Sequence, residues 1–278
     1  MKIGILITAR LKSSRLERKI LLPLNGKSII DWIIGRAKNI CGSEGVVLCT
    51  STNVQDSVLY KNALKNGIEF YPGSEVDVLD RLYNAATYFG YDAFINVTAD
   101  NPLFSMYCAE IMIDWFKKEN FDFGFVDGLP IGMDSHFVKV DALKIANFIR
   151  KESDTEIWGP FVNQPDFFRI ANLTVQTKND FSKKRLTCDY SEDYKLLEVI
   201  YNMYPLSINP PTHSVINKLI DNESLWTINE VHKQIRLPKE KLEEISKAFS
   251  ENIEKGKKFA VNNNFHTIPG TIEKTIHI

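Results

Sequence analysis

Short apolar segments alternate with longer amphipathic segments along the first two-thirds of the chain. The run at residues 3–7 is apolar and rich in isoleucine, with polar residues on both sides. A short apolar run of this kind is typical of a strand that is buried on both faces of a parallel sheet. By the same criteria, together with looser alternation in the later segments, strands are predicted at residues 3–7, 46–49, 68–71, 93–97, 121–126, 135–140 and 167–173.

Segments with helical spacing follow most of these strands. Ser28 precedes apolar residues spaced three and four apart, and serine is a preferred helix N-cap. Asn53 is predicted to cap a second helix, which Gly67 ends. Further helices are predicted at about residues 78–86, 106–118 and 143–150. Because strands that alternate with helices imply parallel crossovers, we expect an α/β fold: a three-layer α/β/α sandwich around a mostly parallel, Rossmann-like sheet.

The alternation of strands and helices is lost towards the C-terminus. We expect one domain over residues 1–204, with an insertion at about 127–180 that serves dimerisation or covers the substrate. The turn-rich start of this insertion, residues 127–132, is expected to lie over the site. The remaining residues, 205–278, contain five prolines and are expected to form a helical C-terminal extension.

Composition argues against several classes of protein. The 278 residues carry a formal net charge of −1, so no overall field attracts nucleic acid or a membrane. No apolar run approaches the roughly 20 residues that span a bilayer, and the first strand begins too early for a secretory signal, so we expect a cytoplasmic protein. The four cysteines lack C-x-x-C spacing and are expected to be reduced thiols. The five histidines lack H-x-x-x-H spacing, so no metal cluster is predicted.

The loop after the first strand concentrates positive charge. Ten residues contain five cations and two hydroxyls, contributed by Arg10, Lys12, Arg15, Arg18, Lys19, Ser13 and Ser14. Open α/β sheets bind ligands at the carboxyl ends of their strands. Guanidinium groups match phosphate oxygens in pairs, and hydroxyls and backbone N–H groups can complete the site. The loop therefore predicts polyphosphate binding; the alternative is a solvated basic loop.

Two aspartates follow predicted strands. Asp100 comes after the strand at 93–97, where a carboxylate can reach a metal held by a nucleotide triphosphate. Asp189 also follows a predicted strand, so both side chains can project from one edge of the sheet towards one cation. Mg²⁺ favours a few carboxylates, with phosphate oxygens and waters completing its shell. The alternative for Asp100 is a helix cap after Pro102.

Residues 9–21, A-R-L-K-S-S-R-L-E-R-K-I-L, resemble the A-R-x-x-S-x-R-L-P-x-K signature of the cytidylyltransferases that activate acidic and related sugars. This family includes CMP-Kdo synthetases, CMP-sialate synthetases and SpsF-like spore-coat polysaccharide proteins. The matching residues are Arg10, Ser13, Arg15, Leu16 and Lys19. The sequence departs from the signature at Glu17, where the family usually has proline, and at Lys12, where it often has glycine. The resemblance implies the fold of the nucleotide-diphospho-sugar transferases.

Two acidic segments carry the same resemblance. Residues 97–103 are similar to the family's G-D-x-P-L element, with Ala99 in place of glycine, and this implies that Asp100 is a Mg²⁺ ligand. Residues 185–194 are similar to R-x-T-x-D-x-x-E-D, which implies that Asp189 completes the metal site and that Arg185 binds substrate. The Glu192–Asp193 pair is expected to open a helix.

Two further segments have weaker assignments. Residues 73–81 are similar to the family's G-S-x-x-D-V-L-x-R element, and Asp77 and Arg81 lie one helical turn apart, so both are predicted to face the nucleotide. The alternative is a surface ion pair that caps the helix. His136 falls where the family has a sugar-side loop and is predicted to contact the acceptor; the alternative is a structural histidine at a strand edge.

The resemblance implies a Mg²⁺-dependent cytidylyltransferase that joins CTP to an acidic sugar or a related metabolite, releases pyrophosphate and serves surface glycan synthesis. From the net charge of −1, neither nucleic acid nor a membrane is expected as a partner. Arg10, Arg15 and Lys19 are the predicted catalytic cations. The predicted nucleotide-binding residues are Ala9, Arg10, Ser13, Arg15, Lys19, Asp77 and Arg81, with the backbone of residues 7–9 facing the base. A homodimer is expected. The alternatives are a glycosyltransferase on a related fold, although no D-x-D motif follows a predicted strand, and an inactive nucleotide-binding paralogue.

Overall fold

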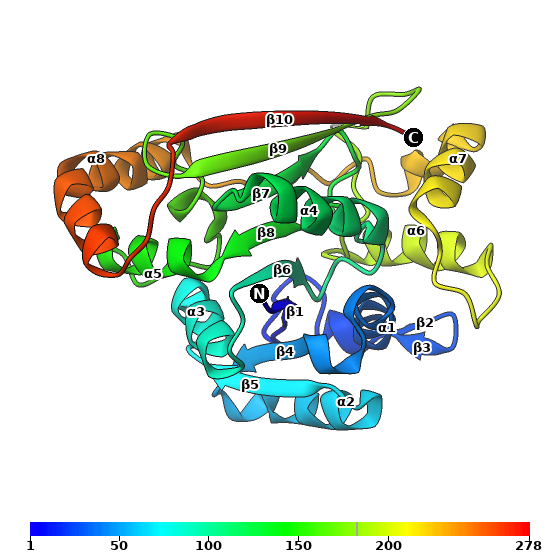
Figure 1. Cartoon of the computed structure of the whole chain (residues 1–278). Coiled ribbons are helices and arrows are strands. Elements are labelled where there is room, and N and C mark those ends of the chain that lie inside the picture. The colour runs from blue at the N-terminus through cyan, green and yellow to red at the C-terminus, as the bar shows by residue number, and fades with distance from the viewer. Residues whose placement is uncertain (182) are drawn as a thin grey trace.

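One mixed sheet organises the chain. The computed structural model describes residues 1–181 and 183–278. Among these residues, one eight-stranded sheet has the order β10-β9-β7-β8-β6-β1-β4-β5 (Figure 1). Its strands are β1 (Ile3–Thr8), β4 (Val46–Ser51), β5 (Glu69–Gly73), β6 (Ala93–Thr98), β7 (Phe123–Asp127), β8 (His136–Lys139), β9 (Arg169–Gln176) and β10 (Gly270–His277). All neighbouring strands run parallel except β8, which is antiparallel to both β6 and β7.

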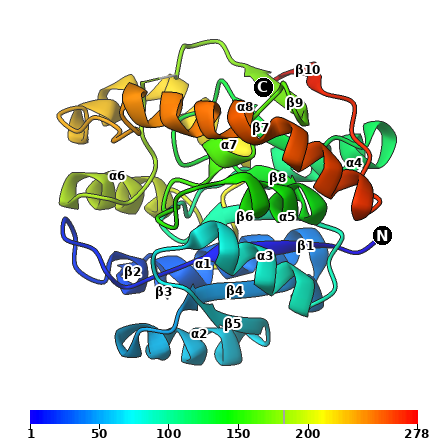
Figure 2. The same cartoon turned by 90° about the vertical axis from the view of Figure 1, so that its left-hand side faces the viewer.

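Helices cover both faces of the sheet. One apolar core includes residues of α1 (Ile29–Cys41), α2 (Leu59–Asn66), α4 (Met106–Glu119), α6 (Ser191–Asn202) and α7 (Thr212–Asp221). The other includes residues of α3 (Val78–Tyr88), α5 (Val140–Ile149) and α8 (Lys239–Asn262), which face the viewer in Figure 2. In β1, Ile5 and Ile7 belong to the first core and Leu6 to the second, which explains why the run at 3–7 is continuously apolar. The predicted three-layer α/β/α sandwich with a mostly parallel sheet is confirmed.

Shorter elements join these layers. A small antiparallel pair, β2 (Pro23–Leu24) with β3 (Lys27–Ser28), precedes α1. Short 3₁₀ segments occur at η1 (Lys19–Leu21), η2 (Ser43–Gly45), η3 (Val54–Val58), η4 (Gly159–Phe161) and η5 (Glu223–Ile228).

The predicted helix ends are confirmed. The Ser28 hydroxyl accepts a hydrogen bond from the Asp31 N–H at 3.3 Å, at the start of α1. The Asn53 side chain accepts one from the Gln55 N–H at 3.1 Å, but the segment that it caps begins as the 3₁₀ turn η3 and becomes α-helical only at α2. Gly67 ends α2 with φ 63°, in the left-handed region that glycine tolerates.

The C-terminal extension needs one correction. Its helices α7 and α8 are present, but residues 270–277 form β10, which pairs in parallel with β9 along the edge of the sheet. Ile272 and Ile276 pack against the first core, whereas Lys274 between them places its ammonium 5.7 Å from the ring centroid of Trp115. The lysine interrupts the apolar alternation, and so the sequence pattern did not reveal the strand. None of the helices in the described ranges is long and apolar enough to cross a membrane.

The cysteines agree with the sequence-based expectation. All four are free thiols, and three of them are buried. Burial raises the pKa of the Cys49 thiol to about 12 and that of Cys41 to about 11. A thiol with such a pKa forms little thiolate near neutral pH, so these side chains act as small apolar residues of the core.

Candidate active site

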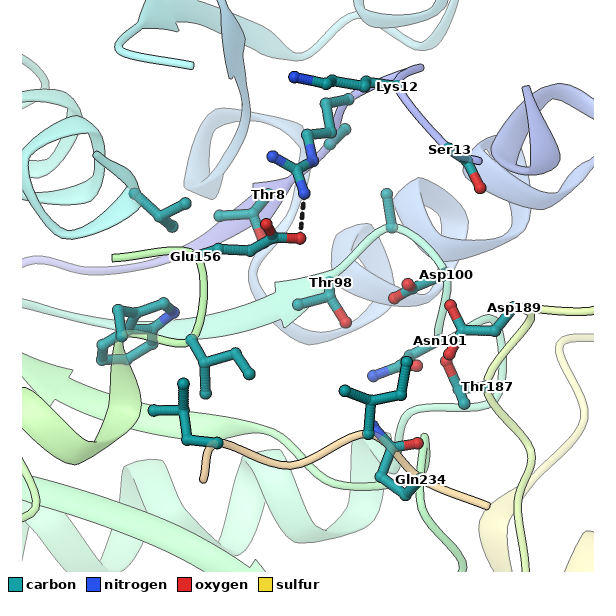
Figure 3. Close-up of a pocket in the computed structure, with 18 of the residues that line it drawn as sticks. Thr8, Lys12, Ser13, Thr98, Asp100, Asn101, Glu156, Thr187, Asp189 and Gln234 are labelled. Carbon is teal, nitrogen blue, oxygen red and sulfur yellow. Dashed lines mark hydrogen bonds and ion pairs between the residues drawn. The ribbon is translucent and has the colours of Figure 1, made fainter. Parts of the chain in front are cut away.

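A cavity of about 890 Å³ opens at the carboxyl ends of β1 and β6. The segments that line it are far apart in the sequence: the loops after β1 and β6, the chain between α5 and η4, the residues before α6, and the C-terminal segment that leads into α8. Figure 3 shows side chains from these segments converging on one space. The carboxyl edge of a parallel sheet gathers them because its strands all end there.

The basic loop lies in this cavity. Five of the predicted residues line it, namely Ala9, Arg10, Ser13, Arg15 and Lys19, and Lys12 lies at the same wall. The loop is anchored by the N–H of Leu11, which donates a 2.7 Å hydrogen bond to Asp56. The structure therefore brings the predicted phosphate-binding cations together. The Ala9 N–H itself donates to the Cys49 carbonyl at 2.9 Å, so this backbone group is not free to contact a base.

Lys19 joins the two predicted metal ligands. Its Nζ lies 2.7 Å from Asp100 Oδ2 and 2.7 Å from Asp189 Oδ1, so these two oxygens are separated by at most twice that distance. The Cys188 N–H also donates to the Asp100 carbonyl at 2.8 Å and fixes the two loops to each other. The two aspartates thus share one edge of the sheet and face one position, as their placement after predicted strands indicated.

The electrostatics of this cluster favour the charged forms of Asp100 and Lys19. Burial acts to raise the pKa of Asp100, but the charge and hydrogen bond of Lys19 outweigh it and hold that pKa below its ordinary value. Burial likewise acts to lower the pKa of Lys19, and the two aspartates outweigh it, so that pKa is raised. Both carboxylate and ammonium are therefore charged near neutral pH.

A second cation, Arg15, contacts Asp189. The Arg15 guanidinium lies 2.9 Å from Asp189 Oδ1 and 5.1 Å from the ring centroid of Tyr190. Its side chain remains about one-third exposed, at 34%. Arg15 can therefore leave the carboxylate and turn towards a bound anion with little rearrangement.

Arg185 occupies a different place from the one expected of a substrate-binding residue. It is 3% exposed and does not line the cavity. Its Nη2 donates to Asp189 Oδ2 at 3.1 Å and to Asp193 Oδ2 at 3.0 Å. Asp193 in turn accepts hydrogen bonds from the Asp189 and Tyr190 N–H groups at the start of α6. In the structure, Arg185 stands behind Asp189 and orients its carboxylate.

Asp77 and Arg81 are not brought to one point. Asp77 caps α3, pairs with Arg150 at 2.5 Å and accepts a hydrogen bond from the Thr155 hydroxyl at 3.0 Å, and it does not line the cavity. The capping alternative describes Asp77, although its ionic partner is Arg150. Arg81 does line the cavity; it is 2% exposed, and its Nε has no hydrogen-bond partner among the described residues.

His136 also lies away from the main cavity. It borders a second cavity of about 340 Å³, where its ring stacks on Phe123 with centroids 5.4 Å apart and meets Trp158 edge-on. Burial lowers its pKa, against the opposing effect of Asp134. Its position on β8 beside Phe123 agrees with the structural alternative for this histidine.

The loop at residues 127–132 supports the site instead of lying freely over it. The Ile131 N–H donates to the Lys184 carbonyl at 2.9 Å, and the Leu186 N–H donates to the Ile131 carbonyl at 2.7 Å. Gly132 has φ 95°, and a Cβ there would lie 2.5 Å from the Thr187 nitrogen. Glycine is required for this close approach, which holds the segment that carries Asp189.

Sequence reasoning missed two walls of the cavity. One is the chain after α5, which contributes Glu152, Glu156 and Trp158; the other is the C-terminal segment, which contributes Gln234 and Lys241. Lys241 Nζ lies 3.3 Å from Glu152 and ties the two walls together. Closely spaced acidic residues after a predicted helix were a visible signal in the first wall, but nothing in the sequence indicated that either wall faces the basic loop.

The cluster of Lys19, Asp100 and Asp189 fits a magnesium–nucleotide complex better than a bare metal ion. Within the described ranges, no group of three or more His, Cys, Asp or Glu side chains could hold a metal. Asp100 and Asp189 offer two carboxylates, and a cation, the Lys19 ammonium, already lies between them. Mg²⁺ binds proteins through one or two carboxylates plus substrate phosphates and waters, which this donor set matches.

Comparison with known proteins agrees with this geometry. The model of the cytidylyltransferase family matches residues 4–210. The chain is 30% identical over 236 residues to the uncharacterised protein MJ1063 of Methanocaldococcus jannaschii, covering 84% of this chain and 97% of the relative. It is 26% identical over 203 residues to the spore coat polysaccharide biosynthesis protein SpsF of Bacillus subtilis, covering 70% of this chain and 85% of the relative.

A solved structure extends the comparison. The cytidylyltransferase from Leptospira borgpetersenii serovar Hardjo-bovis superposes with a TM-score of 0.75 at 26% identity, covering 85% of this chain and all of the other. Residues 4–210, which the family model matches, include the basic loop, Asp100 and Asp189. The chain therefore belongs to the cytidylyltransferase family and is a CTP-dependent nucleotidyltransferase.

Proposed function

We propose that this enzyme transfers the cytidylyl group of CTP to an oxygen of an acidic sugar or a related metabolite, with Mg²⁺ as cofactor and pyrophosphate as the leaving group. The observation that carries the proposal is the cluster of Lys19, Asp100 and Asp189 at the end of one cavity whose adjoining wall is the basic loop. Phosphoryl-type transfer depends on positioning and on charge stabilisation, and this cluster can supply both.

Each residue has a role in this proposal. Asp100 and Asp189 hold the metal, and Mg²⁺ supplies positive charge against the developing charge of the triphosphate. Lys19 and Arg15, released from the two carboxylates, turn to the phosphate oxygens, with Arg10 and the Ser13 hydroxyl at the same wall. The acceptor oxygen attacks the α-phosphorus in line, and no covalent enzyme intermediate is needed.

The choice of CTP over other nucleotides rests on the family and on Arg81. Because the Ala9 N–H is bonded within the sheet, the backbone of residues 7–9 is a poorer candidate for contacts with the base than the sequence suggested. Arg81 lines the cavity, and its guanidinium is a hydrogen-bond donor, so it is the candidate for a contact with an oxygen of the pyrimidine. Thermal-shift titration with CTP, UTP, ATP and GTP in the presence of Mg²⁺ tests the choice, and equal or larger stabilisation by ATP contradicts it.

The acceptor and the pathway are part of the same proposal. The similarity to SpsF supports a role in polysaccharide synthesis. Pyrophosphate release in the presence of CTP, Mg²⁺ and a panel of sugar acids tests the reaction. A protein that binds CTP but releases no pyrophosphate with any acceptor would favour the inactive paralogue; transfer from a preformed nucleotide sugar would favour the glycosyltransferase.

We further propose a homodimer in the cytoplasm. Four free thiols fit a reducing compartment. The dimer is expected through residues 127–180, as the family resemblance implies. Light scattering of the purified protein tests the mass, and a monomer at micromolar concentration contradicts the dimer.

A further inference from the structure

Gln234 connects the C-terminal segment to the candidate metal site. It lies between η5 and α8, outside residues 4–210 that the family model matches, and it lines the cavity. Its Oε1 accepts a hydrogen bond from Arg185 Nη1 at 2.6 Å. Arg185 also holds Asp189, so Gln234 is one residue removed from a predicted metal ligand.

The hydrogen bond fixes which way the amide points. A guanidinium group can only donate hydrogen bonds, so the atom of Gln234 that faces Arg185 must be the oxygen. The amide nitrogen, Nε2, is then directed away from Arg185. Figure 3 shows the Gln234 side chain directed into the space below Asp100 and Asp189. No residue of the described ranges accepts a hydrogen bond from Nε2, so this donor is available to a ligand.

The neighbours of Gln234 define what the donor would contact. Asn101 and Thr187 lie beside it at the aspartate end of the cavity (Figure 3). These three side chains are uncharged and can donate hydrogen bonds, in contrast to the cations of the basic loop opposite. The cations suit the triphosphate, which leaves the uncharged set for the second substrate.

We propose that Gln234 Nε2 binds an oxygen of the acceptor, while Gln234 Oε1 positions Asp189 through Arg185. The bound group is a hydroxyl, carbonyl or carboxylate oxygen of a sugar-type acceptor, close to the oxygen that attacks. This inference rests on the proposed function, because it needs an acceptor in the same cavity. It assigns substrate recognition to a segment that the family model does not include.

Further contacts support the role of the C-terminal segment in positioning Asp189. Asn229, from the same C-terminal segment, donates to Asp193 Oδ1 at 2.8 Å and to the Arg185 carbonyl at 3.1 Å. Asn229 is 3% exposed and Asp193 is 1% exposed. The C-terminal segment therefore holds both groups that orient Asp189.

Two substitutions separate the two roles of Gln234, binding the acceptor and positioning Asp189. Gln234→Glu keeps an oxygen for Arg185 but replaces the donor in the cavity with an acceptor. Gln234→Leu removes both. Gln55→Glu, on the exposed turn η3 and away from the cavity, is the control for the added charge. The probes are 3-deoxy-manno-octulosonate and N-acetylneuraminate, each with CTP and Mg²⁺, and the readouts are the KM for acceptor, the KM for CTP and the Mg²⁺ dependence of CTP binding.

We expect Gln234→Glu to raise the acceptor KM about ten-fold, the size of one lost hydrogen bond, with the KM for CTP within about two-fold of wild type. Gln234→Leu should show the same acceptor defect and also a weaker Mg²⁺ dependence of CTP binding, which a purely local loss of recognition would not produce. Gln55→Glu should match wild type.

Different results would overturn the role of Gln234 and the proposed function of the enzyme. An unchanged acceptor KM in Gln234→Glu, measured in an active enzyme, overturns the acceptor contact. An unchanged Mg²⁺ dependence in Gln234→Leu overturns the positioning role. A wild-type protein that binds CTP and releases no pyrophosphate with either probe instead refutes the proposed acceptor class, and the acceptor contact of Gln234 falls with it.

Discussion

Arg10 and Glu156 form an ion pair across the mouth of the cavity, marked by the dashed line at Glu156 in Figure 3. Arg10 comes from the loop after β1, and Glu156 from the segment after α5. Thr155, next to Glu156, is bound to Asp77 at the start of α3, so the carboxylate is carried by an anchored segment. Glu156 therefore holds a cation that the triphosphate also needs.

Replacing Glu156 should strengthen nucleotide binding. In Glu156→Gln, Arg10 is released and one negative charge is removed from the phosphate wall, so we expect CTP to bind up to about five-fold more tightly, the size of a partly exposed ion pair. Isothermal titration with CTP and Mg²⁺ measures the change. Glu75→Gln is the matched control because Glu75 pairs with Lys12 at 3.3 Å on the same loop. An equal effect of both substitutions would indicate a general charge effect and not a contact of Arg10.

Removing the Lys19 charge should weaken nucleotide binding more than removing its neighbour on the loop. A charge-assisted hydrogen bond to phosphate contributes about 1.5–3 kcal/mol, so Lys19→Met should weaken binding of CTP with Mg²⁺ by about ten- to a hundred-fold. Lys12→Met is the control, because the Lys12 side chain is 65% exposed and pairs with Glu75 and not with Asp100 or Asp189. Retention of wild-type affinity by Lys19→Met would mean that the loop is an ordinary solvated one.

The sequence predicted those parts of the site that depend on strand ends. The basic loop and Asp100 each follow an apolar strand, and parallel strands must end at the same edge, so their convergence follows from topology. The pairing of Asp77 with Arg150 could not be predicted, because spacing within a helix says nothing about a residue from another segment. The place of His136 away from the main cavity could not be predicted either. Its strand, β8, is antiparallel to its neighbours, and its ring packs on Phe123.

The part of the cavity wall that the C-terminal segment forms could not be predicted from the periodicity of apolar residues. Gln234 lies in a segment without regular structure, where no repeat of apolar residues fixes which side chains face inwards. Its side chain is bound to Arg185, a contact that only the folded chain reveals. Residues that complete a cavity from distant segments are therefore the part of such a site that sequence patterns describe least.

The Lys19–Asp100 pair should give the protein a defined pH dependence. A carboxyl whose pKa is lowered by folding stabilises the fold above its unfolded pKa, about 4, and loses this contribution as pH falls. A lysine whose pKa is raised stabilises the fold below its unfolded pKa, about 10.4, and loses the contribution as pH rises. The destabilisation caused by Lys19→Met should therefore be greatest between about pH 5 and pH 9 and should shrink below about pH 4. Urea unfolding of both proteins across this range measures it, and a difference that does not vary with pH would contradict the coupling.

The two aspartates should act on one ion. Asp100→Asn and Asp189→Asn each remove one carboxylate of the pair that faces Lys19, so each should abolish most pyrophosphate release. CTP binding without metal should not weaken, because a negative charge near the phosphates has been removed. Since both residues serve the same ion, the double variant should be scarcely slower than either single one. Asp114→Asn is the control, because Asp114 is an exposed residue of α4 paired with Lys117. Steady-state rates for the four variants, with CTP titrations in the presence and absence of Mg²⁺, provide the measurement. If the effects of the two single substitutions multiplied in the double variant, Asp100 and Asp189 would be acting independently, and a shared metal site would be excluded.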